Sequence, residues 1–214
     1  MHRLALAILF ISCCASVAAA QSDDKPRAEF FGGYSLLRTD YKARQPTPLA
    51  PVIVFVRGDQ TLNGFNVSAT AYLTRGFGLT GDFSGHFKTN RRADPLGGNI
   101  EDRIRVFNLL GGPQYKFRNG SRAAPFVHAL AGVTHTGARL SVPSLRTSEN
   151  KSSTDFALAV GGGLDIRVSE RVTLRAIQID YNPVFVRGNF GGNNELGFGG
   201  TANNVRLSFG VVFR

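Results

Sequence analysis

The chain has 214 residues, a formal net charge of +10, 43% hydrophobic residues and two cysteines. This length fits one domain, and because both cysteines lie within the first 20 residues, the remainder has no disulfide framework. The basic residues are scattered, with no basic helix and no zinc-ligand pattern, which argues against nucleic acid as a partner. Alternation with a period of two recurs over residues 29–213 and predicts an all-β fold.

Residues 1–20 have the three parts of a secretory signal peptide. A short basic start is followed by the apolar run 4–11 and then by small residues. The apolar run is much shorter than the roughly 20 residues of a membrane-spanning helix. We therefore expect cleavage before Gln21 and a single β-barrel domain over 21–214. The alternative, a lipoprotein signal that uses Cys13, requires a lipobox that the preceding residues match poorly.

Eight segments alternate apolar and polar residues in the way that a β-strand requires. Each has about ten residues or more, which is enough for a tilted strand to cross a hydrocarbon core. In chain order the segments are 28–39, 61–73, 77–88, 103–117, 125–137, 154–167, 172–182 and 203–213.

The connections between these segments alternate in length. Short turns follow the second, fourth and sixth strands, whereas the other connections are long and rich in Pro, Gly, Asn and charge, over 40–60, 89–102, 138–153 and 183–202. This pattern predicts an eight-stranded antiparallel up-and-down transmembrane β-barrel with short periplasmic turns and long extracellular loops. Both ends of the chain are then expected on the periplasmic side.

Two strands separate cleanly into an apolar and a polar face. In 77–88, Phe77, Leu79, Phe83 and Phe87 oppose Thr80, Asp82, Ser84, His86 and Lys88, and 154–167 follows the same rule. This arrangement predicts lipid outside and a polar lumen inside, whereas a soluble ligand-carrying barrel would keep its apolar face inside. A soluble β-sandwich, the other alternative, does not require the alternation of short and long connections. Strands 28–39, 103–117 and 125–137 separate less cleanly, so we expect a bulge or a register error there.

The aromatic residues are expected to form two girdles at the membrane interfaces. The lower girdle comprises Phe30, Phe77, Tyr115, Phe117, Phe126 and Phe213, and the upper girdle comprises Tyr41, Phe65, Phe87, Phe107, Phe156 and Tyr181.

The last strand carries apolar residues at strict two-residue spacing, namely Val205, Leu207, Phe209, Val211 and Phe213. Together with 29–35, 161–165, 177–181 and 203–210, this strand resembles the small bacterial outer-membrane β-barrel family that includes the membrane domain of OmpA and the OmpX type. The resemblance implies an outer-membrane location and identifies the last strand as an assembly signal. It implies no activity, because the family has structural, adhesive and enzymatic members. One departure is that Arg214 follows the aromatic on which members usually end.

A polar network is expected to fill the lumen, with Asp82, His86, Lys88, Asp165, Arg167, Gln178, Asp180 and Arg206 as its members. Buried charges require partners, and we expect Asp180 and Arg206 to pair across neighbouring strands.

We predict no catalytic, cofactor or metal site. His86, His128 and His135 lack the spacing of converging metal ligands. Ser84 and His86 share a strand face, but no orienting acid accompanies them.

The leading hypothesis is a non-enzymatic barrel with a structural or surface-interaction role. A narrow pore, a lipid-A-modifying enzyme and a soluble periplasmic binding barrel are the alternatives. The expected partners are outer-membrane lipid, lipopolysaccharide and the barrel-assembly machinery, and we expect a monomer. Basic residues, Arg91, Arg103 and Arg139 among them, outnumber acidic ones in the predicted loops, so an acidic extracellular ligand is a further candidate partner.

Overall fold

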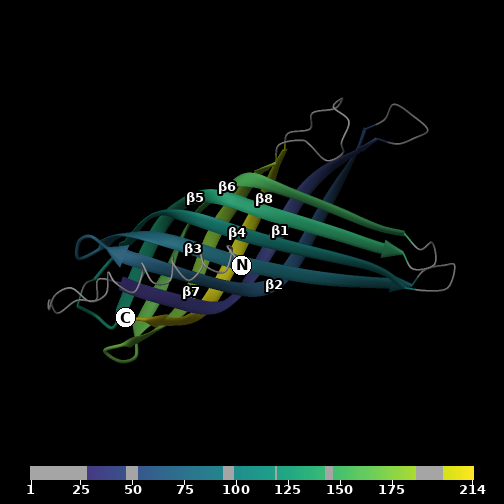
Figure 1. The fold of residues 1–214 in the computed structure, drawn as a ribbon. Helices are drawn as coiled ribbons and strands as arrows, with labels where there is room; N and C mark the ends of the chain where they lie inside the picture. Colours follow the sequence, from purple (N-terminus) through teal and green to yellow (C-terminus); the bar gives the residue numbers. More distant parts are fainter. Residues whose placement is uncertain (1–27, 47–52, 94–98, 119, 143–146, 187–199) are drawn as a thin grey trace, which may run out of the picture.

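The computed structural model describes residues 28–46, 53–93, 99–118, 120–142, 147–186 and 200–214, and the predicted signal peptide lies outside them. The described residues form a closed antiparallel barrel of eight strands, in which each strand pairs with the next and β8 pairs with β1 (Figure 1). The strands are β1 (Ala28–Pro46), β2 (Ile53–Tyr72), β3 (Phe77–Ala93), β4 (Asn99–Lys116), β5 (Ala123–Val142), β6 (Thr147–Arg167), β7 (Val172–Val186) and β8 (Gly200–Phe213). The predicted fold class is confirmed.

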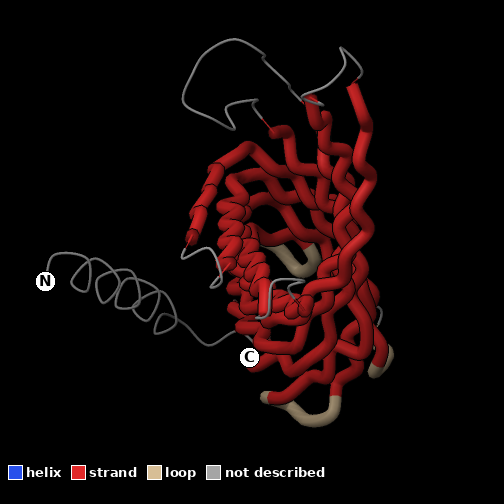
Figure 2. Tube along the Cα trace, turned by 90° about the vertical axis from the view of Figure 1, so that its right-hand side faces the viewer, coloured by secondary structure: helices blue, strands red, loops and turns tan. Residues whose placement is uncertain are grey.

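Closure gives the described sheet no free edge, so neighbouring strands can satisfy the backbone donors and acceptors without water (Figure 2). The short turns after β2, β4 and β6 lie at one end of the barrel, together with the C-terminus (Figure 1). We call this the turn end and the opposite end the far end. Among the described residues there is no helix of the length and apolarity that a membrane span requires.

The turns are stabilised by side chains as well as by backbone pairing. The hydroxyl of Thr74 accepts a hydrogen bond from the backbone N–H of Phe77 at 3.1 Å, and the hydroxyl of Ser169 accepts one from Val172 at the same distance. In the turn after β4, Gly120 has a φ of 75°, which a residue with a side chain rarely adopts. The short connections are therefore specified by their own sequences.

At the far end the strands are longer than the sequence predicted. The β1–β2 ladder continues to the pair Pro46↔Ile53, over much of the segment expected to be a loop. Arg91 and Arg139, which fall within the predicted loops, lie within β3 and β5. Backbone pairing needs no apolar side chains, so an antiparallel ladder can continue through polar sequence beyond the hydrocarbon core. The last described pair of this ladder contains Pro46, which has no N–H to donate.

The outer surface of the barrel is apolar, as the alternation in β3 and β6 predicted. Of the predicted girdle aromatics, Phe30, Phe65, Phe77, Phe87, Tyr115, Phe117, Phe156, Tyr181 and Phe213 are exposed. Phe107 is half-buried beside Phe83 and Phe87, and the side chain of Tyr41 lies outside the described residues.

The prediction that Phe126 belongs to the lower aromatic girdle is wrong. Its ring is only 1% exposed and lies in the lumen, where the guanidinium of Arg175 stacks 4.1 Å from the ring centroid. The inward face of β5 also carries Leu130, so alternation alone could not tell inside from outside on this strand.

The irregularity in the sheet lies in β7 and not in the strands where the sequence suggested one. The described cross-strand pairs of β1, β4 and β5 run without a register shift. In β7 the register shifts between Arg175 and Gln178, so that Ala176 and Ile177 stand opposite the single residue Phe209. This β-bulge keeps both Arg175 and Gln178 buried inside the barrel.

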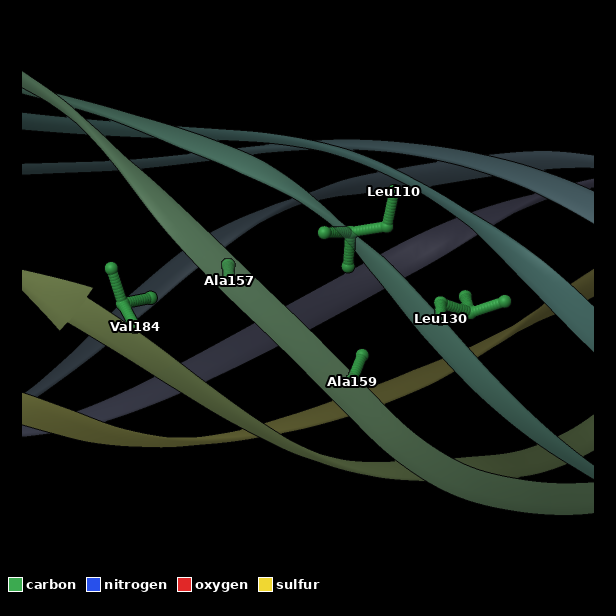
Figure 3. Close-up of a cluster of buried hydrophobic side chains, with 5 residues drawn as sticks. All are labelled: Leu110, Leu130, Ala157, Ala159 and Val184. Carbon is green, nitrogen blue, oxygen red and sulfur yellow. The ribbon is translucent and has the colours of Figure 1, made fainter.

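The lumen contains apolar clusters as well as charged groups. One cluster comprises Leu110, Leu130, Ala157, Ala159 and Val184, from four consecutive strands (Figure 3), and the other comprises Leu37, Leu62 and Val106. On β1, β4, β7 and β8 the clustered or adjoining apolar residues lie farther from the turn end than the buried charge on the same strand. On these four strands the lumen is therefore charged toward the turn end and more apolar beyond it, whereas on β6 the buried Asp155 lies farther from the turn end than Ala157 and Ala159.

Candidate functional site: the ion-pair network of the lumen

Arg206 of β8 connects two opposite parts of the barrel wall. Its Nη1 donates to Oδ1 of Asp82 on β3 at 2.6 Å, and its Nε donates to Oδ2 of Asp180 on β7 at 2.9 Å. All three side chains are at most 2% exposed. The cross-strand pair of Asp180 and Arg206 that the sequence predicted is present, and Asp82 extends it across the lumen.

Asp180 also joins this pair to two further residues. Its Oδ1 lies 2.8 Å from Nε2 of His128 on β5, and its Oδ2 accepts a hydrogen bond from Nε2 of Gln178 at 2.8 Å. A Cβ on Gly161, which is the cross-strand partner of both His128 and Asp180, would lie 2.3 Å from Oδ1 of Asp180. The absence of a side chain at Gly161 therefore leaves room for the buried carboxylate.

A second cluster of charges lies nearer the turn end. Lys116 of β4 bridges Glu29 of β1 and Asp165 of β6, with Nζ 2.7 Å from Oδ2 of Asp165. Arg175 donates from Nε to Asp165 at 2.8 Å and from Nη1 to Gln178 at 2.8 Å. Gln178 thus links this cluster to Asp180 and Arg206, and the two clusters form one continuous network.

Glu29 receives contacts from three cations. Besides Lys116, Nη2 of Arg118 and Nε of Arg214 each lie 3.1 Å from its Oε1. The hydroxyl of Tyr72 donates to Oε2 of Glu29 at 2.9 Å. Arg214, which departs from the family pattern in sequence, therefore participates in the network.

Neutral groups extend the network toward the far end. Asn66 donates to Asp82 at 2.7 Å, and the hydroxyl of Ser84 accepts hydrogen bonds from Arg206 and Asn108 at 3.0 Å each. Thr134 in turn donates to Asn108 at 2.6 Å. Charged and neutral members together span the lumen from β1 to β8.

The residues predicted for the lumen are placed as follows. Asp82, His86, Asp165, Gln178, Asp180 and Arg206 are buried inside the barrel. Lys88 is half-buried on the same face of β3. Arg167 differs from the expectation: it is exposed at the turn end of β6, because the inner face reaches solvent there.

Four further residues belong to the network but were not predicted from the sequence, namely Glu29, Lys116, His128 and Arg175. Apolar residues such as Phe31 and Leu110 share the inner faces of β1 and β4, which hides the alternation that would have marked Glu29 and Lys116. Arg175 lies before the bulge, which shifts the alternation by one residue. A strict period of two, counted from the inward-facing residues after the bulge, therefore places Arg175 on the outer face.

The serine and histidine that the sequence raised as a catalytic possibility are both fully buried in the lumen. Nε2 of His86 lies 2.9 Å from the hydroxyl of Ser35 rather than that of Ser84. Among the described residues, Nδ1 of His86 has no hydrogen-bond partner, so no carboxylate orients the ring. No group of three or more His, Cys, Asp or Glu side chains suited to a metal ion occurs in the described part of the chain.

A closed antiparallel barrel with an apolar outer surface and buried charged groups inside defines an integral outer-membrane β-barrel protein. The chain belongs to the outer membrane protein beta-barrel domain family, whose model matches residues 5–213. Its location is therefore the bacterial outer membrane, with the turn end on the periplasmic side.

Solved structures of outer-membrane proteins share this fold. The attachment invasion locus protein Ail of Yersinia pestis, in complex with the heparin analogue sucrose octasulfate, is 16% identical, with a TM-score of 0.53 over 87% of this chain and 99% of that one. The outer membrane protein OprG of Pseudomonas aeruginosa is 13% identical, with a TM-score of 0.51 over 87% and 94% of the two chains. No curated protein matches this chain by sequence.

Proposed function

We propose that this protein is a non-enzymatic outer-membrane barrel with a structural or surface-interaction role, and that its lumen does not conduct ions or solutes. The observation that carries the proposal is the placement of Arg206, whose guanidinium joins Asp82 on β3 to Asp180 on β7 across the interior. Eight strands enclose an interior just wide enough for side chains to fill. A solute would have to break these buried ion pairs in order to pass.

The contacts of Ser84 and His86 support a non-enzymatic role. The hydroxyl of Ser84 accepts hydrogen bonds from Arg206 and Asn108, and neither Ser84 nor His86 is accessible to lipid. A serine nucleophile requires a base that a third group orients, and His86 lacks that group among the described residues.

We also propose how the protein is exported and inserted into the outer membrane. Residues 1–20 are removed during export, and the barrel-assembly machinery recognises the outward-facing residues of β8, which are Val205, Leu207, Phe209, Val211 and Phe213. Within the described chain the closed sheet offers no unpaired edge to another copy, which supports a monomer.

Conductance in a planar bilayer tests the closed lumen. We expect no discrete current steps from the wild-type protein, whose folded state is verified by a heat-dependent shift in gel mobility. The triple variant Asp82→Ala, Asp180→Ala, Arg206→Ala removes the side chains that cross the lumen and should leak more than wild type. Arg167→Ala is the matched control, because this arginine is exposed at the rim, and should be silent. Reproducible current steps from the wild-type protein would refute the proposal.

Incubation with lipid A tests the non-enzymatic part separately. Mass spectrometry should find the lipid unchanged, and a deacylated or newly acylated product would contradict that part alone.

A further inference from the structure

Three exposed arginines lie together where the lumen opens at the turn end, and we call them the mouth arginines. Arg122 is in the turn after β4, Arg167 is the last residue of β6, and Arg171 is in the turn after β6. The backbone N–H of Arg167 donates to the carbonyl of Arg122 at 2.8 Å. Arg171 lies two residues before Thr173, which is the cross-strand partner of Arg167. Opposed residues on one sheet face have Cβ atoms about 4.5–5.5 Å apart, and diagonal neighbours about 7–8 Å, so three positive charges are concentrated in a small area.

The mouth arginines have no ionic partner within the described part of the chain. None of their three side chains makes an ion pair or a hydrogen bond with another described residue. The buried acids at this end, Glu29 and Asp165, already contact other basic side chains. Glu170 is exposed in the same turn as Arg171 but forms no ion pair with a described residue. Like charges that face each other across strands are destabilising, so this arrangement favours the binding of an anion.

The mouth arginines belong to the lumen side of the barrel wall. Arg167 follows Asp165 at two-residue spacing on β6, and Arg171 precedes Thr173 at the same spacing, where both Asp165 and Thr173 are fully buried inside. The outer face of the same strand ends is apolar and at least 36% exposed, with Ile166, Val168 and Leu174. Membrane lipid therefore lies against the outer face, whereas the arginines lie where the inner face reaches periplasmic water. This favours a soluble anion over a membrane lipid.

The hydroxyl of Thr173 is a second polar group at this place without a partner. It is fully buried, and its oxygen makes no hydrogen bond with any described residue. A buried polar group that is left without a partner costs free energy. An anion held between Arg167 and Arg171 would bring acceptor oxygens to the side of Thr173, because this threonine is the cross-strand partner of Arg167. The orphaned hydroxyl thus supports a ligand site independently of the charges.

A phosphate group suits this arrangement better than a carboxylate. A phosphate monoester carries about −1.5 to −2 charges at pH 7 and has three strong acceptor oxygens. Several guanidinium groups can therefore donate to one phosphate, and each can do so through two parallel hydrogen bonds. A carboxylate carries a single charge and two oxygens. The three arginines thus match the charge and the oxygens of one phosphate group.

We propose that Arg122, Arg167 and Arg171, together with the hydroxyl of Thr173, form a binding site for a soluble phosphate monoester at the periplasmic mouth of the lumen. The site goes beyond the structural or surface-interaction role and does not depend on whether the lumen conducts. Arg167→Ala is silent in the bilayer recording but should weaken phosphate binding. A failure of this site and a failure of the closed-lumen proposal are therefore distinguishable.

The test is calorimetric titration of glycerol 3-phosphate into the purified full chain in nanodiscs of zwitterionic phospholipid. The ionic strength is held fixed, because salt screens exposed charges. The variant Arg122→Gln, Arg167→Gln, Arg171→Gln should bind at least about tenfold more weakly than wild type, since charge-assisted hydrogen bonds are lost. Its matched control, Arg75→Gln, Arg91→Gln, Arg105→Gln, removes the same net charge at exposed positions outside the site and should bind as wild type does.

Three further comparisons separate phosphate recognition from general attraction and from lipid binding. Thr173→Val keeps the size of the side chain and every charge but removes the hydroxyl, and it should bind more weakly than wild type. Glycerate, a carboxylate of similar size, should bind wild type more weakly than glycerol 3-phosphate does. Native mass spectrometry should find equal binding of phosphatidylglycerol to wild type and to the triple Gln variant of the mouth arginines.

Four results would overturn the proposal. The first is the absence of glycerol 3-phosphate binding to wild type, and the second is wild-type affinity in the triple Gln variant of the mouth arginines. The third is an equal loss of binding in the matched control or equal affinity for glycerate, which would indicate general charge attraction. The fourth is a loss of phosphatidylglycerol from the variant, which would assign the arginines to a lipid headgroup. The heat-dependent gel shift verifies that each variant is folded before binding is measured.

Discussion

Arg206 is the residue on which the centre of the lumen depends. It is 1% exposed and is the ion-pair partner of both Asp82 and Asp180. A buried charge that loses its partner keeps its desolvation cost without the compensating attraction. Removing the guanidinium would leave two carboxylates in the interior. Among the described residues, Asp82 would keep only the hydrogen bond from Asn66.

We predict that Arg206→Met lowers the free energy of unfolding by about 3–5 kcal/mol, the range for a broken buried ion pair. Urea unfolding in lipid vesicles, followed by gel mobility, measures the change. Arg167→Met, at an exposed position, should change stability by less than about 0.5 kcal/mol. Adding Asp82→Asn and Asp180→Asn to Arg206→Met should restore part of the loss, and no recovery would contradict the electrostatic explanation.

At the scale of elements, β7 is the irregular strand of the barrel. Besides its bulge, it contains Pro183, which has no backbone N–H. The flanking pairs Ala157↔Val184 and Val160↔Tyr181 place Leu158 of β6 opposite this proline. The side-chain amide of Asn182 donates to the carbonyl of Leu158 at 2.5 Å and supplies the hydrogen bond that the proline cannot.

We predict that Asn182→Ala destabilises the barrel by about 1–3 kcal/mol, because it leaves the carbonyl of Leu158 without this donor. In the double variant Asn182→Ala, Pro183→Val, a backbone N–H becomes available and the loss should be smaller. Urea unfolding of the two single variants and the double variant measures the coupling. Additive effects would show that Asn182 acts in some other way.

The strands differ in how far their sequences predict their faces. In β3 every buried side chain between Phe77 and Phe87 is polar and the exposed large ones are apolar, so alternation was sufficient. In β1 and β5, Phe31, Leu37 and Leu130 are apolar but face the lumen, and the pattern becomes ambiguous. The bulge at Ala176 was not predictable from period-two spacing, because one extra residue inverts the faces on its two sides.

At the scale of the whole molecule, the barrel has an apolar outer wall. On β1, β4, β7 and β8 its lumen is charged toward the turn end and more apolar toward the far end. The alternating turn lengths and the apolar faces predicted the closed barrel. The connectivity of the lumen was less predictable, because contacts such as Glu29 to Lys116 join residues 87 positions apart in sequence. Their proximity depends on the curvature of the closed sheet and on side-chain reach.

The ion pair of Glu29 and Arg214 gives a prediction at this scale. Arg214→Ala should lower the free energy of unfolding by about 1 kcal/mol, because the side chain is partly exposed and Glu29 keeps two other cations. A double-mutant cycle with Glu29→Gln isolates the pairwise term. A coupling energy of zero would indicate that the ion pair of Glu29 and Arg214 contributes nothing measurable to stability.

The position of Glu29 near the start of β1 has a consequence for assembly. Lys116 and Arg118 reach this carboxylate from the end of β4, and Arg214 reaches it from the end of β8. A flat sheet would separate β1 from β4 by two strands, and an unclosed sheet would separate β1 from β8 altogether. The carboxylate acquires its full set of partners only when the sheet has both curled and joined its edges. These contacts therefore stabilise the closed barrel relative to partly assembled intermediates.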